Sequence, residues 1–143
     1  MDGKSIQELR LGDWAEFSKT VTEADVVLFA GVTGDFNPAH VDQVWASRTR
    51  FGGRIVHGIL SAGLISAAIG TRLPGPGSIY LSQELKFLAP VRIGDTLTAR
   101  VEVLEILERR NRTRLGTQVR NQEGTLVVDG TAWVMPPVAQ DAG

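Results

Sequence analysis

One segment constrains the fold of this 143-residue chain more than any other, because residues 58–71 carry only apolar or small side chains. They read Gly-Ile-Leu-Ser-Ala-Gly-Leu-Ile-Ser-Ala-Ala-Ile-Gly-Thr, and the Leu-Pro-Gly-Pro-Gly run that follows ends a helix there. A helix without a polar face is a buried helix, so we expect the rest of the chain to cover it on every side. Its small side chains allow strands to approach closely.

The second half of the chain is patterned as β-strands. Alternating and β-branched runs between turn residues predict four of them, at residues 79–87, 95–107, 113–121 and 125–135. The last two connections are short enough to be hairpins, which makes these strands antiparallel.

The first half predicts one strand and two helices before the buried one. Residues 14–21 alternate as a strand. Thr22 is then the predicted N-cap of a helix that has acidic residues in its first turn and runs to about residue 30. A short helix over residues 42–47 has Asp42 as its cap. The pattern favours an α+β fold, in which an antiparallel sheet curls around one long buried helix.

Composition limits the class of protein. The apolar content of 43% and charged content of 22% indicate one globular domain over residues 1–143, with residues 136–143 as a flexible tail. A net charge of −1 gives no general attraction to nucleic acid or to an anionic membrane. The absence of cysteine excludes disulfides, thiolate catalysis and cysteine metal sites.

Location is predicted from the same composition and from the N-terminus. The N-terminal residues have no apolar core typical of a signal peptide. The longest apolar run, residues 55–70, is shorter than the roughly 20 residues of a membrane span. We therefore expect a cytoplasmic protein with no membrane partner.

A turn-rich segment, residues 29–40, carries the first candidate chemistry. It places Asp35 and His40 on a Pro-containing loop after a helix, and this residue pair commonly moves protons near pH 7. The two side chains converge only if the loop turns, which Asn37-Pro38 favours. The alternative is an Asx turn in which Asp35 and Asn37 merely accept hydrogen bonds from backbone amides.

His57 and Gly58 stand where the buried helix begins. The first amides of a helix have no partner within it, and Gly58 lets a ligand atom come close to one of them. That geometry suits a thioester oxygen that becomes an enolate oxyanion. The alternative is that Gly58 serves close packing and that His57 is a core histidine with satisfied hydrogen bonds.

Two further groups of residues are ambiguous. Ser66 lies about two helical turns after Gly58 on the same face, where it could support a carboxylate or bond back to a helix carbonyl. It has no nucleophile-elbow motif around it. Arginines could hold the phosphates of a nucleotide-bearing substrate, or they could be solvated loop surface. They cluster at positions 48, 50 and 54, and at 109, 110, 112 and 114.

With Asp35 and His40 in Gly-Asp-Phe-Asn-Pro-Ala-His, followed by Ile-Val-His-Gly-Ile-Leu at residues 55–60, the sequence resembles the MaoC-like hydratases. It looks most like their single-domain (R)-specific enoyl-CoA hydratases of the PhaJ type. The similarity continues through residues 73–81 and to Gly94-Asp95. The resemblance implies a hot-dog fold, in agreement with the α+β pattern.

The same resemblance implies roles for six residues. Asp35 and His40 would be the catalytic pair, and the Gly58 backbone amide would hold the thioester oxygen. Asn37, Ser66 and His57 would support them, Asn37 by shaping the loop and Ser66 from beside the carboxylate.

The implied reaction is the reversible syn addition of water to a trans-2-enoyl-CoA, which gives the (R)-3-hydroxyacyl-CoA. It needs no metal and no cofactor, since coenzyme A is part of the substrate. The implied partners are an acyl-CoA or acyl-carrier-protein thioester and a second copy of the chain in a homodimer.

Three alternatives share this fold or its ligand. One is an (R)-3-hydroxyacyl-[acyl-carrier-protein] dehydratase. Another is a hot-dog acyl-CoA thioesterase, although residues 58–71 contain no Asp or Glu to serve one. The last is a non-catalytic thioester-binding module, whose expected loss of Asp35 or His40 is not seen.

Overall fold

The computed structural model describes residues 2–139. Within them, in chain order, lie β1 (Trp14–Thr20), α1 (Glu23–Thr33), α2 (Pro38–Val41), α3 (Gln43–Ala46), α4 (Gly58–Thr71), β2 (Ile79–Phe87), β3 (Thr96–Leu107), the 3₁₀ turn η1 (Glu108–Arg110), β4 (Arg112–Arg120) and β5 (Leu126–Met135). The five expected strands and the buried helix are confirmed, each within one residue of its expected bounds.

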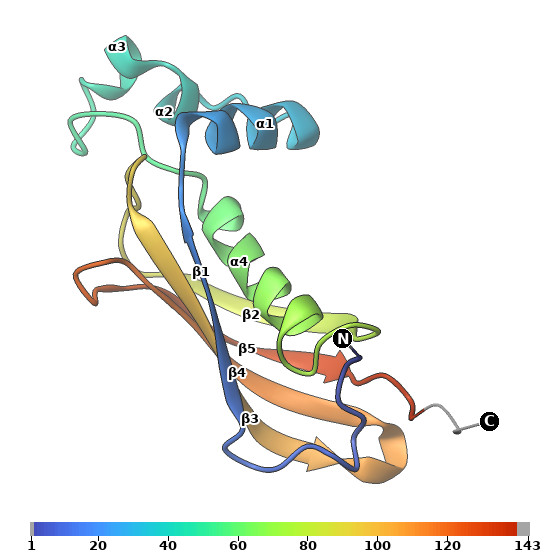
Figure 1. Cartoon of the computed structure of the whole chain (residues 1–143). Helices are drawn as coiled ribbons and strands as arrows, with labels where there is room; N and C mark the ends of the chain where they lie inside the picture. Colours follow the sequence, from blue (N-terminus) through green and yellow to red (C-terminus); the bar gives the residue numbers. More distant parts are fainter. Residues whose placement is uncertain (1, 140–143) are drawn as a thin grey trace.

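The strands form one antiparallel sheet in the order β1-β3-β4-β5-β2. Helix α4 lies across one face of this twisted sheet, while α1, α2 and α3 form a separate layer beyond the N-terminal end of α4 (Figure 1). The sheet stays open, with β1 and β2 as its edges. This arrangement confirms the predicted α+β architecture.

The core lies between α4 and the sheet. Alternate residues of β3 are buried, which is the pattern of a strand with one face toward a core. Inward side chains of α4 meet them, among them Leu64, Ile65 and Ile69. Each such side chain contributes roughly 1.5–3 kcal/mol by leaving water. This packing fixes the start of α4 against the sheet.

The expectation that α4 would be covered on every side is wrong for a single chain. The sheet covers one face of the helix, and Ile59, Gly63 and Ser66 are exposed on another, Ile59 by 57%. An open antiparallel sheet of five strands covers one side of a helix and leaves the opposite side uncovered. The uncovered face is small or apolar.

Helix α1 begins as the sequence predicted. The Thr22 side chain accepts a hydrogen bond from the Asp25 amide and the Asp25 carboxylate accepts one from the Thr22 amide, which is a complete capping box. The helix ends at Thr33, three residues beyond the expected end, because Gly31 is tolerated inside it. Gly34 ends it in the left-handed conformation, with φ 80°.

Two remaining features concern the chain ends and membrane spans. The backbone carbonyl of Pro136 accepts a hydrogen bond from the side-chain Nδ2 of Asn111, so the expected tail is held at its first residue. Residues 140–143 of that expected tail lie outside the described residues. Across residues 2–139, no helix combines the length and the apolar character that crossing a bilayer requires.

Candidate active site

The loop after α1 is built by consecutive side-chain-to-backbone hydrogen bonds. Asp35 Oδ1 accepts from the Asn37 amide at 3.2 Å, and Asn37 Oδ1 accepts from the Ala39 amide at 3.0 Å. Asn37 is thereby the N-cap of α2, and Pro38 is its first residue, a position that suits proline. The Asx-turn reading is therefore correct as local structure. It also brings the Asp35 carboxylate next to α2.

His40 is fixed in one tautomer by the backbone. The residue lies on α2 and is 9% exposed. Its Nδ1 lies 2.7 Å from the Ile55 carbonyl oxygen, which can only accept, so Nδ1 carries the hydrogen. In the neutral ring, Nε2 is then left with a free lone pair. An imidazole held this way is positioned to take a proton at Nε2.

The His57 ring stacks against the His40 ring. The two ring centroids are 3.9 Å apart with the planes tilted by 30°, and the Phe29 ring packs on His57 at 4.8 Å. His57 Nε2 donates to the backbone carbonyl of Asp35 at 3.0 Å. The ring is 1% exposed, and within residues 2–139 its Nδ1 has no hydrogen-bond partner. His57 therefore ties the Asp35 backbone and the His40 ring to the start of α4.

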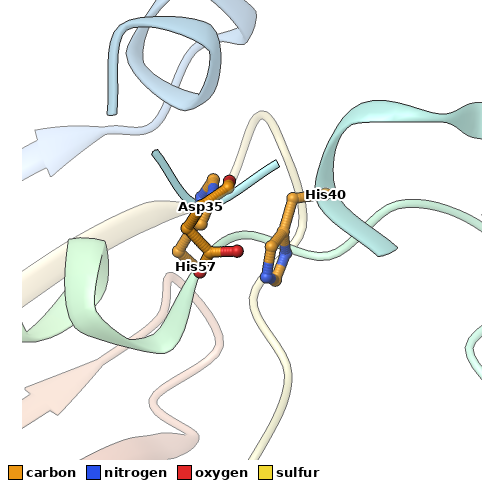
Figure 2. Close-up of side chains that lie close together, drawn as sticks. All are labelled: Asp35, His40 and His57. Atoms are coloured by element: carbon orange, nitrogen blue, oxygen red, sulfur yellow. The ribbon is translucent and has the colours of Figure 1, made fainter. Parts of the chain in front are cut away.

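Figure 2 shows the Asp35 carboxylate directed toward His40, with His57 beside it. One ligand-type atom from each of the three residues lies within 4.8 Å of the other two. Such proximity alone would allow a metal ion. The stacking argues against one, because lone pairs in the planes of two rings stacked 3.9 Å apart and tilted by 30° do not converge on a point about 2.0–2.1 Å from both nitrogens. The arrangement suits proton transfer better than metal binding.

Gly58 is the first residue of α4, after His57 as N-cap. The His57 side chain makes no capping hydrogen bond, so the first amides of the helix are free of a side-chain partner. A Cβ on Gly58 would lie 2.8 Å from two ring carbons of Phe87 at the end of β2. Close packing at Gly58 is therefore real, and it leaves the backbone amide available.

Ser66 lies on the exposed face of α4 and borders a cavity of about 340 Å³ between this helix and β2. The cavity starts at Ile59, next to Gly58, and is almost entirely apolar. Its lining residues are Ile59, Ala62, Gly63, Ser66, Tyr80, Leu81, Ser82, Gln83 and Leu85. Its lining does not include Asp35, His40 or Gly58, although Ile59 directly follows Gly58 in α4. The contact of Ser66 with the carboxylate stays a prediction.

One polar network borders the same cavity. The Tyr80 hydroxyl donates to Gln83 Oε1, and Gln83 Nε2 donates to Thr117 Oγ1 at 2.9 Å. Partial burial of the hydroxyl raises the pKa of Tyr80 to about 12. Tyr80 thus lines the cavity without adding charge.

The arginines of the two clusters make different contacts. Arg54 pairs with Glu23, which raises the pKa of the guanidinium and lowers that of the carboxyl. Arg114 pairs with Glu105 on the sheet. Arg50 instead lies over the Phe51 ring, in the loop that leads to His57.

Three contacts at the site were not predicted from the sequence. They are the Phe29 ring on His57, the Ile55 carbonyl that sets the His40 tautomer, and the Phe87 ring over Gly58. Phe29 and Phe87 stand in ordinary helix and strand patterns, and a backbone carbonyl leaves no mark in the residue type. The signal for them exists in the tertiary contacts.

A model of the MaoC like domain matches residues 11–125 of the chain. The chain belongs to the MaoC-like family. This MaoC-like protein is 49% identical over 132 residues to the (R)-specific enoyl-CoA hydratase of Rhodospirillum rubrum, covering 92% of this chain and 91% of that one. It is 47% identical to the 3-hydroxybutyryl-CoA dehydratase of Methylorubrum extorquens, covering 96% and 87%.

The MaoC-like fold is also found in solved structures. The unliganded R-hydratase PhaJ1 of Pseudomonas aeruginosa superposes with a TM-score of 0.91 at 50% identity, over 96% of this chain and 88% of that one. Both the family resemblance and the hot-dog fold expected from the sequence are thereby confirmed.

Proposed function

We propose that this protein is an (R)-specific enoyl-CoA hydratase, a hydro-lyase that adds water to a trans-2-enoyl-CoA to give the (R)-3-hydroxyacyl-CoA. The observation that carries the proposal is the Asp35–His40 pair, held together at the start of α4 in a chain that is 49% identical to such a hydratase. The reaction is reversible, so the same site would dehydrate the hydroxyacyl thioester.

Asp35 and His40 would divide the work on the water molecule. The Asp35 carboxylate accepts one hydrogen bond from the water, and His40 Nε2 takes a proton from it as the oxygen bonds to C3. The electron pair of the double bond moves toward the thioester and forms an enolate. One of the two residues, Asp35 or His40, then returns one proton to C2, so that one water molecule is added in all.

The start of α4 would stabilise the enolate. Free amides and the positive end of the helix dipole lie there, and the Gly58 amide would donate to the thioester oxygen. The apolar cavity beside Ile59 would take the acyl chain, with Ser66 on its wall. Side chains and one backbone amide supply this chemistry, so the proposed mechanism uses neither metal nor redox cofactor.

The alternatives fit less well. A thioesterase of this fold would need a carboxylate on or beside the long helix. Helix α4 itself has none, and Asp35 near its start lies with His40, the pair that a hydratase needs. A binding module would have no need for the preserved Asp35–His40 pair. A dehydratase specific for acyl-carrier-protein thioesters is disfavoured, because the relatives at 47–49% identity carry CoA-thioester names.

The direct test is to mix the purified protein with crotonyl-CoA and follow absorbance of the conjugated thioester. We expect a loss of this absorbance, an (R)-3-hydroxybutyryl-CoA product on chiral analysis, and the same rate after treatment with a chelator. Release of free thiol would instead favour the thioesterase. Binding without turnover would favour the non-catalytic module.

We also propose that the active form is a homodimer and that the protein works in the cytoplasm. The dimer is supported by the uncovered face of α4 and by β2, an open edge strand with apolar side chains exposed. The location rests on the cysteine-free composition. A single domain over residues 1–143 likewise stays a prediction.

A further inference from the structure

An aromatic ring flanked by arginines lies in the loop between α3 and α4. The guanidinium carbon of Arg50 is 4.7 Å from the centroid of the Phe51 ring, and that of Arg92 is 6.0 Å away. Phe51 and Arg92 are half-buried, whereas Arg50 is exposed. We call Arg50, Phe51 and Arg92 the arginine–phenylalanine patch.

The two cations of this patch have no acidic partner. Among the residues that the structure describes, ion pairs engage Arg54, Arg100 and Arg114, whereas Arg50 and Arg92 form none. Asp95 is close to Arg92 in sequence, but its Oδ2 accepts a hydrogen bond from the backbone amide of Arg92 and forms no ion pair with the guanidinium. Arg92 Nη1 donates to the Gly53 carbonyl at 3.5 Å, and its other N–H groups, with those of Arg50, remain for an anion.

Short backbone links connect the patch to the active site. The Val56 amide donates to the Val91 carbonyl at 2.7 Å, which places Arg92 next to the segment that enters α4. The Ile55 carbonyl, one residue earlier, holds His40. From Phe51 to Gly58 the chain spans seven residues, or at most about 25 Å when fully extended. A ligand with a long flexible arm can reach both places.

We propose that the arginine–phenylalanine patch binds the phosphate-bearing nucleotide end of a CoA thioester whose acyl group lies at Gly58. Guanidinium forks match phosphate oxygens, and the Phe51 ring between the two arginines keeps both guanidinium groups near one place. The inference rests on the proposed function and makes it more specific, because a site for the nucleotide favours a free CoA thioester over one attached to a carrier protein.

The test compares two substrates with the same acyl group, crotonyl-CoA and the crotonyl thioester of N-acetylcysteamine, which lacks the nucleotide. We expect Arg50→Gln and Arg92→Gln each to raise KM for crotonyl-CoA roughly tenfold, as loss of a charge-assisted contact does. KM and kcat for the short thioester should stay unchanged. The KM of the unmodified protein for crotonyl-CoA should rise with salt, and the variants should show a smaller rise.

Arg100→Gln is the matched control, because Arg100 also lies over an aromatic ring, 4.1 Å from that of Trp14, but on the sheet and paired with Glu16. It should leave both substrates unaffected. Arg92→Lys keeps the charge and should recover part of the KM. An unchanged KM for crotonyl-CoA in both Gln variants would overturn the proposal, as would an equal change for the two thioesters. Failure of the unmodified protein to hydrate either thioester would instead count against the proposed function.

Discussion

At the scale of single residues, Asp35 combines a structural and a chemical role. Its carboxylate accepts the Asn37 amide in the turn, and its backbone carbonyl accepts from His57. A structural role alone and a catalytic role make different predictions for Asp35→Asn, because an amide oxygen still accepts the same hydrogen bond but carries no charge.

We expect Asp35→Asn and His40→Gln each to lower kcat by about 10²–10⁴-fold while the protein stays folded, since acid–base groups contribute that much. Steady-state hydration of crotonyl-CoA and a thermal melt on each variant provide the check. If the two groups act as a unit, the double variant should lose little more than either single one. A folded Asp35→Asn protein with a near-normal rate would contradict the mechanism.

His57 is a positioning residue, and its two contacts can be separated by substitution. His57→Gln can keep a donor to the Asp35 carbonyl but loses the stacked ring, whereas His57→Phe keeps a ring and loses the donor. We expect both to lower kcat by roughly tenfold or more with little change in KM, because the reacting groups move while the thioester contacts remain. Steady-state kinetics on the two variants separates the contacts.

His57→Phe also serves as a control for stability, because a Phe ring fits the buried site and leaves no ring nitrogen without a hydrogen-bond partner. If only folding depended on this position, the Phe variant would melt at or above the original temperature and retain kcat. Equal KM increases with unchanged kcat in both variants would remove His57 from the positioning role.

At the scale of elements, the junction of α4 and β2 decides how Gly58 behaves. The Phe87 ring occupies the space a Cβ would need, with ring carbons 2.8 Å from that position. From the sequence alone, Gly58→Ala is predicted to keep or slightly raise thermal stability, as Gly→Ala does in a helix whose backbone angles permit it. The observed contact makes it destabilising unless the half-exposed ring moves.

We expect Gly58→Ala to lower both the melting temperature and kcat, and the double variant Gly58→Ala/Phe87→Leu to recover stability but not activity. Loss of an oxyanion donor costs about 2.7–4 kcal/mol in the transition state, close to a hundredfold or more in kcat. Phe87→Leu alone is the control for the ring. Recovery of kcat together with stability in the double variant would show that Gly58 serves packing alone.

Several elements were readable from sequence because their signals are local. Strand alternation gave β2 with its bounds unchanged, and Thr22 and Asp42 marked the starts of α1 and α3. Helix α2 was missed although Asn37-Pro38 is a good start signal, because a single turn buries too little to show periodicity. The partner of β2 is β5, and no local pattern encodes so distant a pairing.

The site, like the fold, has features that residue types predict and features that depend on tertiary packing. The turn chemistry of Asp35 and Asn37 follows from residue type, so their hydrogen bonds could be anticipated. The stacking of His40 on His57 joins residues from α2 and the start of α4, and it depends on how these elements pack. Residue types therefore indicated the participants, and the fold determined their orientation.

At the scale of the whole molecule, apolar side chains are exposed in several regions of one chain, two of which concern assembly. The first is the layer of α1 and the loop after it, where Val32 is 85% exposed and Phe36 is 60% exposed. The second is the face made by α4 and the edge strand β2, which lie side by side (Figure 1). Ile59 and Ile79 are exposed on these two elements. Contiguous apolar surface of this kind marks a protein–protein interface more often than bare solvent-facing surface.

We expect light scattering to give twice the 15.5 kDa mass of one chain. A charge on an edge strand prevents its pairing with another edge, so Ile79→Lys on β2 should produce monomers. Ser18→Lys, on the opposite edge strand β1, is the matched control and should remain dimeric. If the cavity beside α4 needs a partner to close it, the Ile79→Lys monomer should bind crotonyl-CoA at least tenfold more weakly while its melt remains cooperative. An unmodified protein that is monomeric and fully active would refute the dimer, and a dimeric Ile79→Lys protein would move the interface away from β2.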